Sequence, residues 1–245
     1  MSDINNHQRV NDILLGPLER PALKWLAAHM PAWVMPDTLT TIGVVGAVIT
    51  FLGYVLSNFD RNFLWLASLG FVINWFGDSL DGTLARYRHI ERPVFGFFLD
   101  HTVDAFIEVL IFVGLGLTPY VSFSVASMAL IGYLLLSVIV YVRTAVVGEF
   151  KISYGKLGPT EIRVLAILLN TWMYFGGVWT FLVQQFEVSP YDLIVGAIAL
   201  LLFSFATVTT VKETRRLVNV DAVIKHEESK GQDAQLKERG AVGDM

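Results

Sequence analysis

The stretch FLWLASLGFVINWFGDSLDGTL, residues 63–84, decides the fold of this chain. A helix needs about 20 mainly apolar residues to cross a hydrocarbon core of about 30 Å, and this stretch is long enough. Its last third nevertheless carries Asp78 and Asp81. An aspartate inside a membrane helix costs about 2.5–3.5 kcal/mol on insertion scales and usually marks a functional site. The stretch therefore predicts a membrane-spanning helix with a site near one end.

The composition of the whole chain supports a membrane protein. Of its 245 residues, 54% are hydrophobic and only 16% are charged, and the mean hydropathy is +0.55. A soluble domain has about 25% charged residues, so disorder and a collagen-like fibre are excluded. The net charge of −4 argues against a nucleic-acid partner. Without cysteine, the chain has no disulfide, no thiolate nucleophile and no Cys-ligated metal.

Long apolar runs between turn residues predict an all-α fold, an integral membrane helical bundle with six transmembrane helices. Helices are favoured over a β-barrel because the runs do not alternate between polar and apolar residues. The expected spans are Thr38–Leu56, Phe63–Leu84, Phe95–Leu117, Val121–Val147, Ile162–Phe186 and Tyr191–Val211.

The distribution of Lys and Arg predicts the orientation of these spans. One set of short loops holds only Arg61, whereas the other set and both termini hold most of the positive charges. By the positive-inside rule both termini face the cytoplasm. Residues 1–36 are expected to form an interfacial amphipathic segment, residues 37–217 the six-span domain, and residues 218–245 a polar, disordered cytoplasmic tail. We find no convincing internal repeat.

Four aspartates are predicted to converge near the cytoplasmic ends of the second and third spans. Asp78 and Asp81 are three residues apart, and Asp100 and Asp104 are four residues apart, so each pair shares a helix face. A helical hairpin brings the two faces to the same depth. Four carboxylates at one place repel one another unless a cation is bound. Hard divalent cations accept several carboxylate oxygens, which predicts two ions, Mg²⁺ or Mn²⁺. The alternative is that these acids only cap helices and face water.

These residues also resemble the signature of the CDP-alcohol phosphotransferases, which runs D-x2-DG-x2-AR, a short spacer, then G-x3-D-x3-D. Every fixed position of that signature is present in this chain: Asp78, Asp81, Gly82, Ala85, Arg86, Gly96, Asp100 and Asp104. The stretch Met35–Thr40 is similar to the family's entry to the first span, with Asp37 where the family commonly has Asn.

The resemblance implies a metal-dependent transfer of a phospho-alcohol group from a CDP-linked alcohol to an acceptor hydroxyl, with release of CMP. It assigns metal binding to Asp78, Asp81, Asp100 and Asp104, with Asp104 also acting as general base. Gly82, Ala85 and Gly96 are expected to line the CDP site, and Arg86 either binds the diphosphate or stabilises the carboxylate cluster. The resemblance further implies membrane lipids as surroundings and a homodimer.

Five other residues carry open alternatives. Glu161 and Arg163 either begin the fifth span or reach the substrate. Arg143 is expected to extend to lipid phosphate rather than bind substrate, and His101 to lie behind the metal ligands. Asn170 is expected to form an interhelical hydrogen bond. Arg88, Arg92, Lys151 and Lys156 are expected to form a positive rim.

The resemblance leaves the two substrates open. The Asp100-His101 pair is similar to that of choline and ethanolamine phosphotransferases, which use a diacylglycerol acceptor, and Ala105 stands where enzymes of inositol phosphate or glycerol phosphate carry Lys or Arg. The alternative is phosphatidyl transfer from CDP-diacylglycerol to a small polar alcohol. A cation or proton transporter with a carboxylate relay and an inactive scaffold are hypotheses from other classes. We expect the inner membrane of a bacterium, with the active site cytoplasmic.

Overall fold

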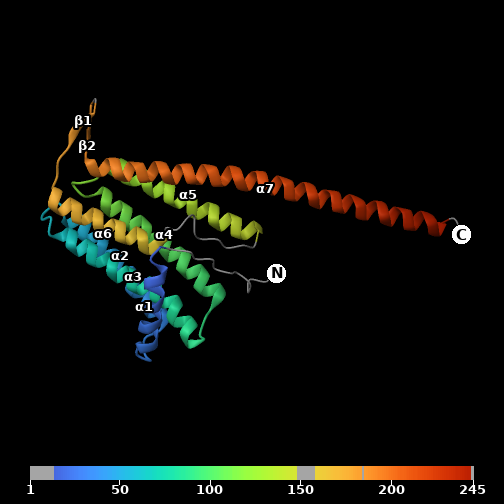
Figure 1. Cartoon of the computed structure of the whole chain (residues 1–245), viewed down its shortest axis with the longest axis horizontal. Coiled ribbons are helices and arrows are strands. Elements are labelled where there is room, and N and C mark those ends of the chain that lie inside the picture. Colours follow the sequence, from blue (N-terminus) through green and yellow to red (C-terminus); the bar gives the residue numbers. More distant parts are fainter. Residues whose placement is uncertain (1–13, 148–157, 184, 244–245) are drawn as a thin grey trace.

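The computed structural model describes residues 14–147, 158–183 and 185–243, and side chains are not described for residues 219–243. This part of the chain is mostly helical (Figure 1). In chain order its elements are α1 (Gly16–His29), α2 (Pro36–Leu56), α3 (Phe63–Arg88), α4 (Pro93–Gly116), α5 (Phe123–Val147), α6 (Pro159–Gly176), β1 (Phe181–Val183), β2 (Phe186–Val188) and α7 (Pro190–Gly243).

Glycines hold α2 and α3 in close contact along their length. A Cβ atom added to Gly77 would lie 2.3 Å from the backbone nitrogen of Gly43, and one added to Gly46 would lie 2.4 Å from the backbone nitrogen of Asn74. Small residues at a helix interface let two backbones approach, which is a common device in membranes. This contact fixes α3, and with it Asp78, against α2.

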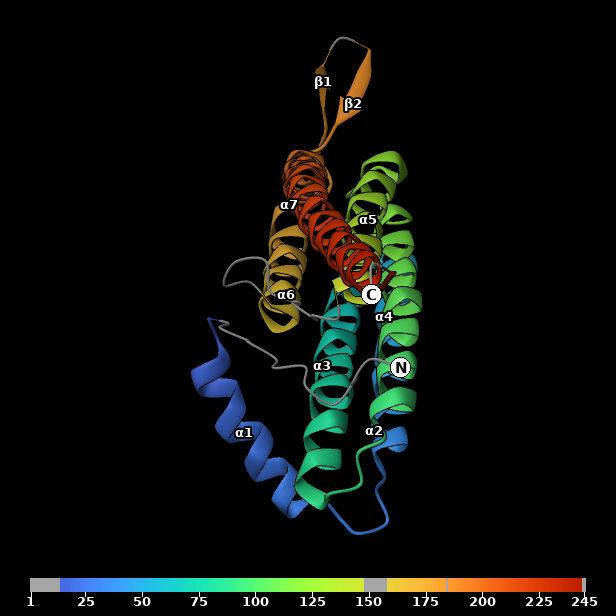
Figure 2. The same cartoon turned by 90° about the vertical axis from the view of Figure 1, so that its right-hand side faces the viewer.

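The remaining helices pack around this pair. α4 contacts α2 and α5, α6 contacts α3, and α5 contacts α7. Figure 2 shows the β1–β2 hairpin projecting from one end of the bundle and α1 lying near the opposite end. The larger hydrophobic core includes Tyr54, Phe71, Met173 and Tyr191, at the hairpin side of the bundle.

α1 is tied to the bundle by polar contacts at both its ends. The carboxylate of Glu19 accepts hydrogen bonds from the Trp75 indole at 2.8 Å and from the Thr160 hydroxyl at 2.7 Å. The guanidinium of Arg88 donates to the carbonyl oxygens of Met30 and Val34 at 2.9 and 2.6 Å. Arg88 therefore caps the end of α1. It makes this structural contact instead of standing in the positive rim that the sequence predicts.

The fifth predicted span, Ile162–Phe186, is wrong in its second half. α6 ends at Gly176, and Gly177 has φ +70, a backbone conformation that residues with a Cβ rarely adopt. The chain then forms the short antiparallel hairpin, with Leu182 opposite Glu187. The two adjacent glycines stop the helix, and the β-branched and aromatic residues that follow favour strands.

The predicted disordered tail is also wrong in its local structure. α7 continues from the last predicted span as far as Gly243 and extends well beyond the other helices (Figure 1). The segment is polar but rich in Lys, Glu, Gln and Ala, which are good helix formers. Polarity predicts that a segment does not join a core, but it does not prevent a helix.

Four of the described helices are long and apolar enough to cross a membrane: α2, α3, α5 and, within α7, Pro190–Val218. The six expected spans also include α4 and α6. α4 carries Asp100, Asp104 and Glu108 within three turns, and α6 is shorter and carries Glu161 and Arg163. Their charge is the reason that length and composition alone select four helices rather than six.

Candidate active site

The α3–α4 connection places the aspartates of the two helices opposite each other. α3 ends at His89, whose φ of 56 lies in the left-handed region and turns the chain away from the helix axis. Pro93 then begins α4 at a position where its missing N–H costs nothing. α3 and α4 both pack on α2 rather than closely on each other, yet their aspartate side chains meet, as the sequence predicts.

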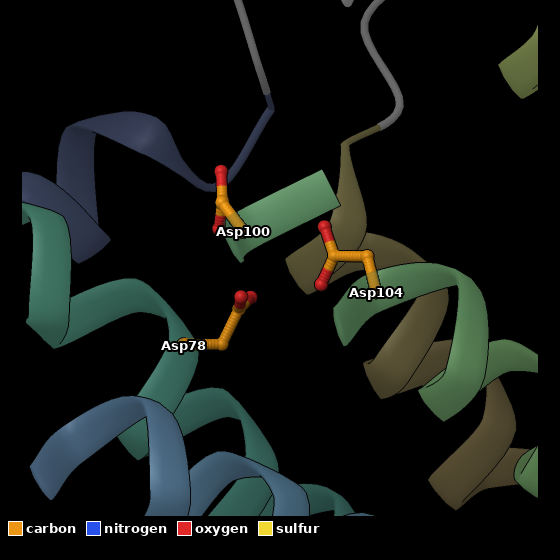
Figure 3. A group of neighbouring side chains, drawn as sticks. All are labelled: Asp78, Asp100 and Asp104. Atoms are coloured by element: carbon orange, nitrogen blue, oxygen red, sulfur yellow. The ribbon is translucent and has the colours of Figure 1, made fainter. Parts of the chain in front are cut away.

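Asp78, Asp100 and Asp104 form a compact carboxylate triad. One oxygen from each of the three side chains lies within 4.8 Å of the others. Figure 3 shows Asp78 reaching from α3 toward Asp100 and Asp104, which come from successive turns of α4. All three residues are partly buried. Oxygen donors at this spacing suit a hard divalent cation.

Asp81 lies beside this triad rather than within it. Its Oδ2 atom accepts a hydrogen bond of 2.6 Å from the Thr40 hydroxyl on α2, and its other oxygen accepts one from the backbone N–H of Gly82. It is still close enough to Asp78 and Asp100 to interact with them electrostatically. The structure thus brings three of the four predicted ligands together and holds the fourth next to them by a bond to α2.

Arg163 supplies a positive charge to the triad. Its Nη2 atom lies 2.6 Å from Oδ2 of Asp78, and its Nε atom donates at 2.8 Å to the side-chain oxygen of Asn74. Asn74 is fully buried one turn before Asp78 and also donates to the carbonyl of Gly43 on α2. Arg163 therefore contacts a carboxylate of the triad, and its expected contact with the substrate stays a prediction. A guanidinium on Asp78 occupies a place where a metal cation would bind.

The four residues expected at the CDP group lie on the same helical hairpin. A Cβ on Gly82 would lie 3.3 Å from a guanidinium nitrogen of Arg86, whereas a Cβ on Gly96 would meet nothing within 4 Å. Arg86 is exposed, and its guanidinium donates to the Thr83 hydroxyl at 3.3 Å. Ala85 is only partly buried. Gly96 thus offers open backbone on α4 and Arg86 an exposed cation on α3, and their contact with a nucleotide stays a prediction.

Three other predicted residues have defined contacts. Glu161 is buried and accepts from the backbone N–H groups of Leu15 and Gly158, so it caps α6 and fastens the start of α1. His101 has its Nδ1 atom 3.6 Å from Asp100, stacks on Phe97 and lies behind the triad, as expected. Asn170 accepts from the Tyr54 hydroxyl and donates to Ser68, which confirms its interhelical role.

Arg143 departs from its prediction. Its Nε atom lies 3.3 Å from Glu213 of α7, and only 12% of its side chain is exposed. It joins α5 to α7 rather than extending to lipid, because a buried carboxylate is within reach. Lys151 and Lys156 lie outside the described residues, and Arg92 pairs with Asp37.

Sequence reasoning missed two residues beside the site. Glu108 follows Asp104 by four residues and so continues the acidic face of α4. Asn74 precedes Asp78 by four residues on α3. Extending each aspartate pair by one helical turn would have found both.

Comparison with known proteins finds a family that matches most of the chain. The family described as CDP-alcohol phosphatidyltransferase matches residues 33–212. A phosphatidylinositol phosphate synthase of Cutibacterium acnes is 39% identical over 92 residues, which is 37% of this chain and 41% of that protein. Cholinephosphotransferase 1 of Danio rerio is 30% identical over 162 residues, which is 63% of this chain and 42% of that protein. The human protein of that name is 26% identical over 178 residues, 67% of this chain and 42% of its own length. The chain thus spans about two fifths of the length of these relatives.

Proposed function

Because the chain belongs to the CDP-alcohol phosphatidyltransferase family, we propose that it transfers a phospho-alcohol group from a CDP-alcohol to an acceptor hydroxyl, with release of CMP, in phospholipid biosynthesis. The observation that carries the proposal is the triad of Asp78, Asp100 and Asp104. Residues from the two halves of the family signature meet there, on two helices and at one depth.

The donor set fits two divalent cations, Mg²⁺ or Mn²⁺. All the donors are carboxylate oxygens, which are the ligands that hard divalent cations prefer. Asp78, Asp81, Asp100 and Asp104 would hold the ions. Such ions, when bound, bind diphosphate oxygens and stabilise negative charge on the leaving group.

In the reaction the acceptor oxygen bonds to the β-phosphorus of the CDP-alcohol. The bond from that phosphorus to the bridging oxygen breaks, and CMP leaves with the bonding electrons. Asp104 accepts the proton of the attacking hydroxyl, because it stands at the edge of the triad farthest along α4 from the loop. Arg86 binds a phosphate of the nucleotide, and Gly82, Ala85 and Gly96 leave room for the CDP group.

For the substrates we favour a CDP-linked amino alcohol, choline- or ethanolamine-like, with a diacylglycerol-type acceptor. This choice is supported by the Asp100-His101 pair and by the relatives named cholinephosphotransferase 1. The alternative is phosphatidyl transfer from CDP-diacylglycerol to a small polar alcohol, and the relative named phosphatidylinositol phosphate synthase keeps it open.

A transporter with a carboxylate relay has little support. Its acids would have to continue through the bilayer, yet α4 has no ionisable residue between Glu108 and its end at Gly116. The line of carboxylates therefore stops inside the bundle, as expected of an enzyme with a site open to one side.

We also propose that α4 and α6 cross the membrane, for six spans with both termini and the site in the cytoplasm. The polar side chains Arg163 and Asn170 of α6 contact Asp78 and Tyr54 of other helices, and Asp100 and Asp104 of α4 meet Asp78 of α3. Large apolar side chains of the same helices are exposed, among them Phe98, Phe106, Leu165 and Leu168. Lipid contact accounts for this arrangement. α1 as an interfacial helix, the domain limits at residues 36 and 217, a homodimer and a bacterial inner membrane remain predictions.

One assay tests the proposed reaction. Purified protein with Mn²⁺ or Mg²⁺ is given CDP-choline, CDP-ethanolamine or CDP-diacylglycerol, each with its acceptor, and CMP release is measured. CMP release that needs both the metal and one of these pairs is expected. No CMP from any pair would contradict the proposal, and release only with CDP-diacylglycerol would select the alternative substrates.

A further inference from the structure

Glu108 is a carboxylate that the proposed reaction does not use. It follows Asp104 by one helical turn, about 5.4 Å along α4, on the face that carries Asp100 and Asp104. Its Oε2 atom is buried and has no hydrogen-bond partner in the described part of the chain. No Lys or Arg of the described residues lies within ion-pair distance of it. A buried, unpaired carboxylate oxygen is costly, and its persistence calls for a ligand.

Tyrosines of α5 line the same place. The Tyr133 side chain lies close enough to the Glu108 carboxylate to interact with it, and the Tyr133 ring lies 6.4 Å from the Phe112 ring. Tyr141, two turns further along α5, lies 5.3 Å from the His101 ring and interacts electrostatically with Glu108 and Asp104. The Glu108 carboxylate, whose Oε2 atom has no hydrogen-bond partner among the described residues, therefore lies beside tyrosine side chains of α5.

A carboxylate together with aromatic rings is the environment that binds ammonium and quaternary ammonium groups. We propose that Glu108, with Tyr133 and Tyr141, binds the positively charged head group of the alcohol and so selects cationic alcohols over neutral or anionic ones. This inference rests on the proposed function for the position of the substrate. The one turn between Asp104 and Glu108 is a length that a short amino alcohol can bridge.

Arg163 offers the competing explanation. Its Nη1 atom is also buried without a hydrogen-bond partner among the described residues, and its charge interacts with Glu108. If Glu108 only balanced this guanidinium, its loss would affect all substrates equally. If Glu108 binds the head group, its loss affects charged alcohols alone. The two roles therefore predict different substrate profiles.

The test compares CDP-choline with the CDP ester of 3,3-dimethylbutanol, its neutral analogue of the same shape. Equilibrium binding to the full chain with Mn²⁺ is measured by calorimetry, for the wild type, Glu108→Gln, Glu108→Asp and the matched control Glu187→Gln, whose residue is exposed in β2. We expect the wild type and the control to bind the charged ester roughly tenfold or more tightly than the neutral ester. Glu108→Gln should remove the preference, and Glu108→Asp should restore part of it.

Equal binding of both esters by the wild type, or binding of neither, would overturn the inference even if Glu108→Gln does not fold. If Glu108→Gln weakened the binding of both esters equally, the role of Glu108 would be to balance the charge of Arg163. That result would also overturn the inference. Turnover is scored separately: a wild type that prefers the charged ester but releases no CMP contradicts the proposed function and leaves the head-group site standing.

Discussion

Asp104 is the residue on which the proposed chemistry depends most directly. It stands between Asp100 and Glu108 on α4, and it interacts electrostatically with both and with Asp78. Asp104 and its neighbours are all carboxylates. The proposed general base therefore differs from the metal ligands in its role and not in its chemistry. Substitution is therefore the means to separate the base from the ligands.

At Mn²⁺ concentrations that saturate the site, we expect Asp104→Asn to retain CDP binding but to lower kcat by about 10²–10⁴-fold, the usual contribution of a general base. An amide keeps the shape and an oxygen donor but cannot accept the proton. CMP release and equilibrium binding of CDP measure the two effects. Turnover like that of the wild type would remove Asp104 as the base.

The metal ligands carry a second prediction. Asp78→Asn and Asp100→Asn should each weaken Mn²⁺ binding by roughly tenfold or more, because each removes one charged donor from the triad. Paramagnetic resonance of free Mn²⁺ measures the affinity. Asp60→Asn, in the exposed loop before α3, is the control and should bind Mn²⁺ as the wild type does. Unchanged affinity in both triad variants would place the metal elsewhere.

At the scale of the element, the α2–α3 contact positions the site. Thr40 of α2 holds Asp81, and the α2 carbonyl of Gly43 holds Asn74, which in turn receives Arg163. Each of these bonds needs the two backbones to be close, and glycine makes that possible at Gly43, Gly46 and Gly77. Packing between two apolar helices therefore controls the geometry of a polar site.

Gly77→Ala should destabilise the protein by about 1–3 kcal/mol, the usual cost of overpacking. Its Cβ would lie 2.3–2.7 Å from backbone atoms of α2, and a backbone cannot yield as a flexible side chain can. Thermal unfolding in detergent measures the loss. Gly196→Ala on α7 is the matched control, since the nearest atom to its Cβ is 3.9 Å away. Equal Tm values for the two variants would contradict the close α2–α3 contact.

At the scale of the whole molecule, the orientation of the bundle can be tested by labelling single introduced cysteines. No native cysteine has to be removed first, because the chain has none. Two variants are made, Asn62→Cys and Glu91→Cys. Position 62 lies in the α2–α3 connection, and position 91 lies in the α3–α4 connection. In intact cells an impermeant maleimide should label position 62 and not position 91, which becomes reactive only after lysis. Labelling of position 91 from outside would reverse the proposed orientation.

Most helices and the place of the site could be predicted from the sequence, because a helix in a bilayer must satisfy its own backbone and show a long apolar run. Asp78, Asp100 and Asp104 could be assigned to one site because a short loop keeps the end of α3 close to the start of α4, although each helix packs mainly on α2. The end of α6 and the length of α7 could not be placed from the same signal. Apolarity does not distinguish a helix from the hairpin after Gly177, and polarity does not exclude a helix beyond residue 217.

By itself, the sequence determined that this is a helical membrane protein with a carboxylate site on two neighbouring helices, since hydrophobic length and i, i+4 spacing are local properties. Only the tertiary structure decided which distant side chains complete that site: Thr40 on Asp81, Arg163 on Asp78, and Tyr133 beside Glu108. These contacts join residues between 25 and 85 positions apart. Whether such residues meet depends on how the helices pack, and no local pattern encodes that.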